Sequence, residues 1–88
     1  MLYILNSDIK DSSRIDAFVQ ELDKLGEYVS FMPKCYFLKP KADVTALQIY
    51  DSLKSVLKDE DLILLSPADL NEMNGWLSSS VVNWLKNT

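Results

Sequence analysis

Two short runs of the chain are uniformly apolar. The first, residues 2–5, stops at Asn6-Ser7-Asp8, and the second, residues 62–65, stops at Ser66-Pro67. Apolar runs of this length that end at turn-forming residues predict strands, and an unbroken apolar run is typical of a strand buried on both faces. The charged residues 58–61 before the second run predict a break between two secondary-structure elements.

Two other segments have the spacing of amphipathic helices. Apolar side chains recur three and four positions apart between Ser12 and Leu25, with Ser12 and Ser13 as N-cap candidates and Gly26 as a stop. A second helix is predicted after Pro40, where Thr45 and Gln48 have the spacing of a capping box. Its apolar stripe comprises Ala46, Ile49, Tyr50, Leu53, Val56 and Leu57.

Aromatic and β-branched residues concentrate in segments 28–32 and 34–38. Pro33 lies between them and cannot donate to a sheet ladder, which favours two strands joined by a tight turn. The predicted order is strand, helix, strand, strand, helix, strand. This order indicates an α+β, ferredoxin-like βαββαβ fold, in which two helices cover one face of a four-stranded antiparallel sheet.

Residues 68–88 follow this predicted core of residues 1–67 as a C-terminal extension within a single domain. We expect a loop at 69–75, a short strand at Trp76-Leu77 and a final helix capped by the serines at 78–80. Two tryptophans in this extension are costly to leave in water, since each can bury about 200 Å². The extension is therefore expected to pack on its own sheet or to dock on another chain.

Composition then limits the chemistry. Thirteen acidic and nine basic residues give 88 residues a net charge of -4, which disfavours a broad phosphate-binding surface. The absence of histidine excludes Ser-His-Asp and Cys-His catalysis and zinc sites that use imidazole. Cys35 is the only cysteine, which favours a reducing, cytoplasmic compartment, and it is interpreted as a buried apolar side chain or a reactive thiol. No apolar run approaches the roughly 18 residues of a membrane span.

Several motifs, taken in their order and spacing, carry a resemblance to a known family. They are residues 3–9, Lys34-Cys35-Tyr36-Phe37-Leu38, Asp43-Val44-Thr45-Ala46 with Gln48, Ile49 and Asp51, and Asn74-Gly75-Trp76-Leu77 with Trp84-Leu85-Lys86. Together they resemble the small ferredoxin-like proteins related to the CRISPR-associated Cas-two family, most closely its SinR-like branch. The resemblance implies a homodimer, and it implies that the Asp ending the first strand meets its two-fold mate at a divalent metal.

Asp8 is the residue at that position. Mg²⁺ or Mn²⁺ held by paired Asp8 carboxylates would polarise a phosphodiester and activate water, giving an endonuclease for RNA or DNA without histidine. Asp8 is thus the candidate catalytic and metal-ligating residue. The alternative is structural, because Asp at a strand end hydrogen-bonds its own backbone and shapes the turn.

Two further groups of residues are open to two interpretations. The only basic concentration comprises Lys34, Lys39 and Lys41, which would contact about three phosphates, or would instead protect an edge strand against unwanted pairing. Aromatic side chains are expected in the core or at a dimer or partner interface. The interface candidates are Tyr28, Phe31, Tyr36, Trp76 and Trp84.

Three functions remain as alternatives. The first is a homodimeric, non-catalytic interaction or adaptor module, favoured by the acidic balance and by the sheet face that the two predicted helices leave open. The second is the metal-dependent nuclease centred on Asp8. The third is an acidic inhibitor that blocks a nucleic-acid-binding protein.

Overall fold

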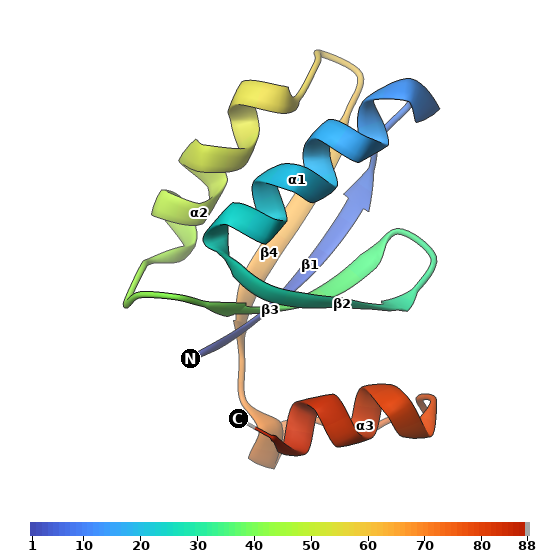
Figure 1. The fold of residues 1–88 in the computed structure, drawn as a ribbon, viewed down its shortest axis with the longest axis vertical. Helices are drawn as coiled ribbons and strands as arrows, with labels where there is room; N and C mark the ends of the chain where they lie inside the picture. The colour runs from blue at the N-terminus through green and yellow to red at the C-terminus, as the bar shows by residue number, and fades with distance from the viewer. Residues whose placement is uncertain (88) are drawn as a thin grey trace.

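The computed structural model describes residues 1–87, which form a four-stranded antiparallel sheet and three α-helices (Figure 1). The α+β class and the antiparallel sheet predicted from the sequence are confirmed, and the arrangement is compatible with a ferredoxin-like fold. Among these residues, no helix has the length and apolar character needed to cross a bilayer. The elements in chain order are β1 (Leu2–Asp8), α1 (Ile15–Leu25), β2 (Gly26–Met32), β3 (Cys35–Pro40), α2 (Ala46–Leu53), β4 (Leu62–Ala68) and α3 (Ser79–Lys86).

The strands lie side by side in the order β2-β3-β1-β4. β1 is an interior strand in which Leu5 lies between Tyr36 of β3 and Leu65 of β4. β3 is also interior, so the interpretation of Lys34, Lys39 and Lys41 as protection for an edge strand is wrong. The edges of the sheet are β2 and β4, and neither could be identified from the local sequence because edge position depends on the pairing of the whole sheet.

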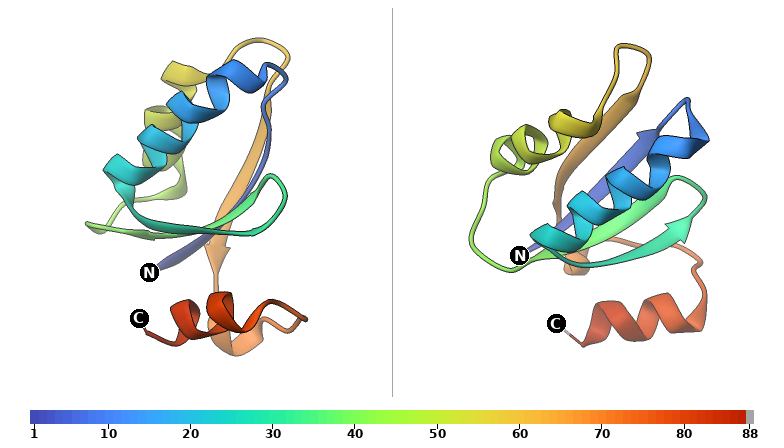
Figure 2. Two further views of the ribbon diagram at one scale, coloured as in Figure 1. Left: turned by 45° about the vertical axis from the view of Figure 1, so that its right-hand side comes forward. Right: turned by 45° about the horizontal axis from the view of Figure 1, so that its top comes forward.

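Alternate side chains along each strand enter two apolar clusters, one on each face of the sheet. α1 and α2 cover the first face, where the buried residues are Tyr3, Leu5, Ile9, Phe18, Leu22, Leu38, Ile49 and Leu53. α3 packs on the opposite face, where Leu2 and Phe37 of the sheet meet Val81 and Leu85 of the helix. Figure 2 shows β2 and β3 lying between α1 and α3. The face expected to be bare is thus partly covered by the chain's own extension.

The start of α1 differs from the prediction. Asp11, rather than Ser12 or Ser13, supplies the cap, because its carboxylate accepts the Ser13 N–H at 3.0 Å and opens a 3₁₀ turn that leads into the helix. The hydroxyl of Ser13 also donates to Asp11. The cap therefore lies before the predicted one, and Arg14 occupies the first position before α1 without a side-chain cap.

The end of α1 is where the sequence places it, at Gly26, but the physical reason is a close approach between strands. The backbone of Gly26 is extended and begins β2. A Cβ at this position would lie 2.1 Å from the Lys39 carbonyl oxygen of β3, so a side chain has no room. The predicted hairpin between β2 and β3 is confirmed, and Lys34 takes a left-handed conformation with φ of 67° in its turn.

The predicted capping box of α2 is confirmed in both directions. Thr45 Oγ1 accepts the Gln48 N–H at 3.1 Å, and Gln48 Oε1 accepts the Thr45 N–H at 2.8 Å. The predicted end of β4 at Ser66-Pro67 is wrong, since pairing continues to Ala68 opposite Leu2. An edge strand tolerates proline when the missing N–H falls on its open side.

The extension folds back on the sheet of the same chain. The helix predicted after the serines is confirmed as α3, with Ser78 Oγ accepting the Val81 N–H at 3.4 Å. The strand predicted at Trp76-Leu77 is wrong, because these residues have no sheet partner in the described structure. Leu77 instead joins the apolar cluster under α3.

Candidate functional site

Asp8 ends β1 on the sheet face opposite α1 and α2, and lies across from Leu62 of β4. Its carboxylate is about one-third exposed and accepts hydrogen bonds from Lys10 and, at 3.1 Å, from Lys34. The hydrogen bond from Lys10, followed by the one from Lys34, lowers the pKa of Asp8 below its ordinary value. Asp8 is therefore an ion-paired carboxylate at neutral pH.

This arrangement does not fit a resident divalent cation within one chain. Mg²⁺ requires several oxygen ligands, whereas Asp8 contributes a single carboxylate whose two oxygens already contact ammonium groups. Within residues 1–87, no three His, Cys, Asp or Glu side chains gather as a metal-binding group. A cation at Asp8 would have to displace both lysines and draw its remaining ligands from another molecule.

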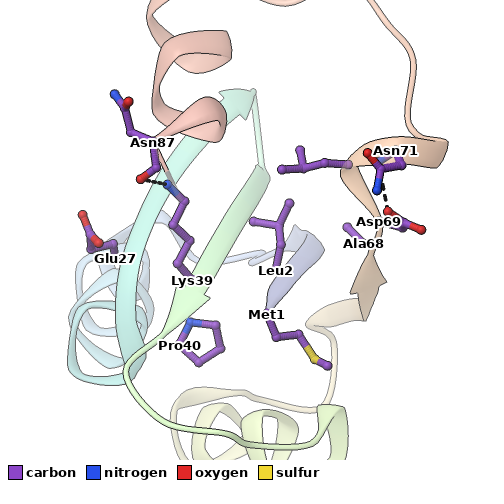
Figure 3. Close-up of a pocket in the computed structure, with 10 residues that line it drawn as sticks. Met1, Leu2, Glu27, Lys39, Pro40, Ala68, Asp69, Asn71 and Asn87 are labelled. Carbon is purple, nitrogen blue, oxygen red and sulfur yellow. Dashed lines mark hydrogen bonds between the residues drawn. The ribbon is translucent and has the colours of Figure 1, made fainter.

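The three candidate lysines for nucleic-acid contact are not brought together. Lys34 lies in the β2–β3 turn beside Asp8, while Lys39 and Lys41 lie toward the other end of β3 and beyond it. Lys39 donates to the carbonyl oxygens of Trp84 and Asn87 at the end of α3, and Figure 3 shows it extending toward Asn87. Its ammonium also lies 3.8 Å from the centre of the Trp84 ring. Lys39 thus fastens α3 to the sheet and neutralises the carbonyl end of the helix.

Three of the predicted interface aromatics are engaged within the chain. Tyr28 and Tyr36 pack edge to face on the side of α1, with ring centres 6.3 Å apart. Burial raises the pKa of the Tyr36 hydroxyl. Phe31 stacks on Phe37 on the opposite face, with ring centres 4.2 Å apart. These contacts account for all three side chains as parts of the two cores.

The two tryptophans of the extension have opposite environments. Trp84 is half-buried in the cluster beneath α3, under the ammonium of Lys39. Trp76 is 99% exposed. The expectation that the extension packs on its own sheet therefore holds for Trp84, whereas Trp76 makes no comparable contact and stays a candidate contact residue for another molecule.

The thiol of Cys35 is half-buried and donates to the side-chain oxygen of Asn6 at 3.2 Å.

Two open hollows flank α3. One, of about 550 Å³, lies between Lys39 and Asn71 at the base of β3 (Figure 3). The other, of about 500 Å³, lies between Phe31, Phe37 and Met73. Two titratable groups that line the first hollow, Lys39 and Asp69, are already hydrogen-bonded, to the end of α3 and to the Asn71 N–H respectively.

The sequence prediction missed an exposed apolar surface that lies along the edge strand β4. Leu62 and Leu64 are 63% and 71% exposed, on the part of the α3-bearing sheet face that α3 does not cover. Leu47 and Tyr50 of α2 are 66% and 42% exposed and border the same strand on its other face. We call these four side chains, with the backbone of β4 between them, the β4 edge surface.

A uniformly apolar run is the sequence signal for this surface, but the same run is typical of a strand buried on both faces. Leu62-Ile63-Leu64-Leu65 carries no charge, and Ile63 and Leu65 do pack beneath α2. Only the strand order reveals that Leu62 and Leu64 face solvent at an edge. Natural edge strands usually carry charges that prevent pairing, so an exposed uncharged edge indicates a contact surface.

The chain was compared with protein-family models, curated proteins and solved structures, and none of them matches. The resemblance to Cas-two-related proteins thus stays a prediction from the quoted motifs. In the geometry of this chain, Asp8 is ion-paired, the three lysines are separated, and β4 presents an apolar edge.

Proposed function

We propose that this chain is a non-catalytic interaction module that works as a homodimer, built on a ferredoxin-like βαββαβ unit of the SinR-like, Cas-two-related kind. One observation carries the proposal, namely the β4 edge surface. Its leucines are exposed and uncharged beside an unpaired strand, which is the condition under which a sheet recruits another chain.

The total accessible surface supports a second chain. The molecule exposes 5944 Å². A compact monomer of this size exposes about 5,200 Å². The molecule thus exposes about 700 Å² more than this trend, as expected when apolar side chains such as Leu62 and Leu64 are not covered by their own chain.

The charge distribution supports an interaction role over phosphate binding. The net charge is -4, and two of the three clustered lysines of the sequence, Lys34 and Lys39, are engaged by Asp8 and by the end of α3. The β4 edge surface contains no ionic side chain, so two copies can approach there without repulsion between like charges.

Gel filtration with light scattering tests the proposal. The wild-type protein is expected to have twice the mass of one chain at micromolar concentration. Leu64→Glu should be a monomer with an unchanged circular dichroism spectrum, because its side chain is exposed and because two carboxylates would meet in the contact.

Met32→Glu is the matched control, since Met32 is 51% exposed on the other edge strand, β2. It should remain a dimer. A wild-type monomer throughout the concentration range would refute the homodimer. A Leu64→Glu variant that still dimerises would show that the β4 edge surface is not the contact.

A further inference from the structure

The open hydrogen-bonding groups of β4 can be assigned from the sheet register. The N–H of Ser7 donates to the Lys34 carbonyl at 2.9 Å, so the odd-numbered residues of β1 direct their backbone groups toward β3. The even-numbered residues of β1 are therefore directed toward β4, where Asn6 lies opposite Leu64. It follows that Ile63, Leu65 and Pro67 direct their backbone groups to the open edge of the sheet.

Two features limit which of these groups can pair with another strand. Pro67 has no N–H to donate. Before the strand, the amide of Asp61 is already used, because it donates to the Lys58 carbonyl at 2.9 Å within its own turn. The free donors and acceptors of the edge are thus centred on Ile63 and Leu65, one on each side of Leu64.

We propose that the occupant of this edge is the β4 strand of a second copy, paired antiparallel about a two-fold axis at Leu64. This inference rests on the homodimer proposed above and adds its register. Ile63 of each chain pairs with Leu65 of the other, and Leu64 lies opposite its own counterpart. If the two-fold axis passed through Ile63, Leu65 would pair with Asp61 of the other copy, whose N–H is already used. If the axis passed through Leu65, Ile63 would pair with Pro67, which has no N–H to donate.

Side chains and charges agree with this register. Each face of β4 borders a hollow, one of about 260 Å³ beside Leu47 and Tyr50 and one of about 190 Å³ beside Asp8 and Leu62. Side chains of the second copy would fill both. The paired residues 62–66 are uncharged, and the acidic turn at 59–61 lies outside them. The product is one continuous sheet with α1 and α2 of both chains on the same side.

Single-cysteine crosslinking tests the register in a Cys35→Ala background. Residues directly opposite each other between hydrogen-bonded positions have Cα atoms about 4.5 Å apart, within the range for a disulfide. Leu64→Cys should therefore oxidise rapidly to a covalent dimer. Leu62→Cys is the matched control, because it has similar exposure on the same face but lies about 13 Å from its counterpart in this register.

Equal crosslinking of the two variants, or faster crosslinking of Leu62→Cys, would overturn the register. If light scattering nevertheless shows a dimer, the proposed function survives and only the strand pairing is wrong. Amide hydrogen exchange on the unmodified protein gives an independent measurement. The Ile63 and Leu65 amides should become more protected as concentration rises, and exchange that is independent of concentration at both would contradict the pairing.

Discussion

At the scale of single residues, the most highly connected carboxylate is Asp61 rather than the predicted Asp8. The Asp61 side chain is fully buried and accepts hydrogen bonds from the Arg14 guanidinium, at 3.0 Å from Nη2, and from the Lys10 and Lys58 N–H groups at 3.0 and 2.9 Å. It joins the turn before β4 to the start of α1. Sequence patterns did not indicate this role, because Asp61 stands in a charged run typical of a solvent-exposed turn.

The hydrogen bond from Arg14 holds the pKa of Asp61 well below its ordinary value. A carboxyl with a lowered folded-state pKa stabilises the fold above its unfolded pKa of about 4, and this contribution is lost as the pH falls below that value. Asp61→Asn is therefore expected to lower the unfolding free energy at pH 7, and its difference from wild type should shrink in acid.

Urea denaturation of each variant at pH 7 and at pH values below about 4 is the measurement, with Asp59→Asn as an exposed control from the same turn. A difference between wild type and Asp61→Asn that stays constant with pH would show that the ionised carboxylate is not the source of the stability.

At the scale of elements, α3 is held by an apolar contact and by a cation at its carbonyl end. Val81 and Leu85 are buried against the sheet, and Lys39 of β3 bonds the final carbonyls of the helix. Helix periodicity in the extension predicted α3 itself. It did not predict the role of Lys39, because a lysine in a basic segment has the same local pattern whether it binds phosphate or caps a distant helix.

The two tryptophans provide a matched test of this docking. Trp84→Ala should lower the free energy of unfolding by about 2–3 kcal/mol, less than for a fully buried tryptophan, because part of its surface is already in water. Trp76→Ala should change it by no more than about 0.5 kcal/mol, since its side chain is 99% exposed.

Urea unfolding monitored by circular dichroism measures both variants. Equal losses would mean that Trp76 is buried in solution, against another chain or against the sheet. A negligible effect of Trp84→Ala would contradict the docking of α3.

At the scale of the whole molecule, the position of the dimer contact separates the interaction module from the nuclease. The nuclease requires two Asp8 carboxylates at one ion. In the proposed dimer two β4 strands separate the two β1 strands, which places them about 14 Å apart at the usual strand spacing. Each Asp8 then keeps Lys10 and Lys34 as its partners.

Mg²⁺ or Mn²⁺ is accordingly expected to leave the melting temperature unchanged relative to NaCl of equal ionic strength. The melting temperature of Asp8→Asn should likewise be the same in the divalent salt and in NaCl. A metal-dependent rise in melting temperature that Asp8→Asn abolishes, together with cleavage of RNA or DNA, would instead support the nuclease.

The sequence by itself determined the element types, most of their order and several of their boundaries. The capping box at Thr45 is a local feature, so neighbouring residues were sufficient to predict it. Likewise, the two apolar runs and the hairpin around Pro33 follow from short-range patterns. The helix stop at Gly26 was also predicted from the sequence, although its physical reason, the close approach of Lys39 in β3, is tertiary. The predicted end of the first strand after Leu5 is wrong, because β1 continues through Asp8, whose partner Lys34 comes from a distant turn.

Only the tertiary structure decided which strand is an edge, where α3 packs and which charges are paired. The run Leu62-Ile63-Leu64-Leu65 has the same pattern in an interior strand and in an edge strand, because exposure is set by the neighbouring strands and not by the run itself. Lys39 and Trp84, or Arg14 and Asp61, meet across more than forty residues, a distance at which local periodicity contains no information. The candidate interaction surface is therefore a product of strand order, since the fold leaves the most apolar strand of the sheet without a neighbour on one side.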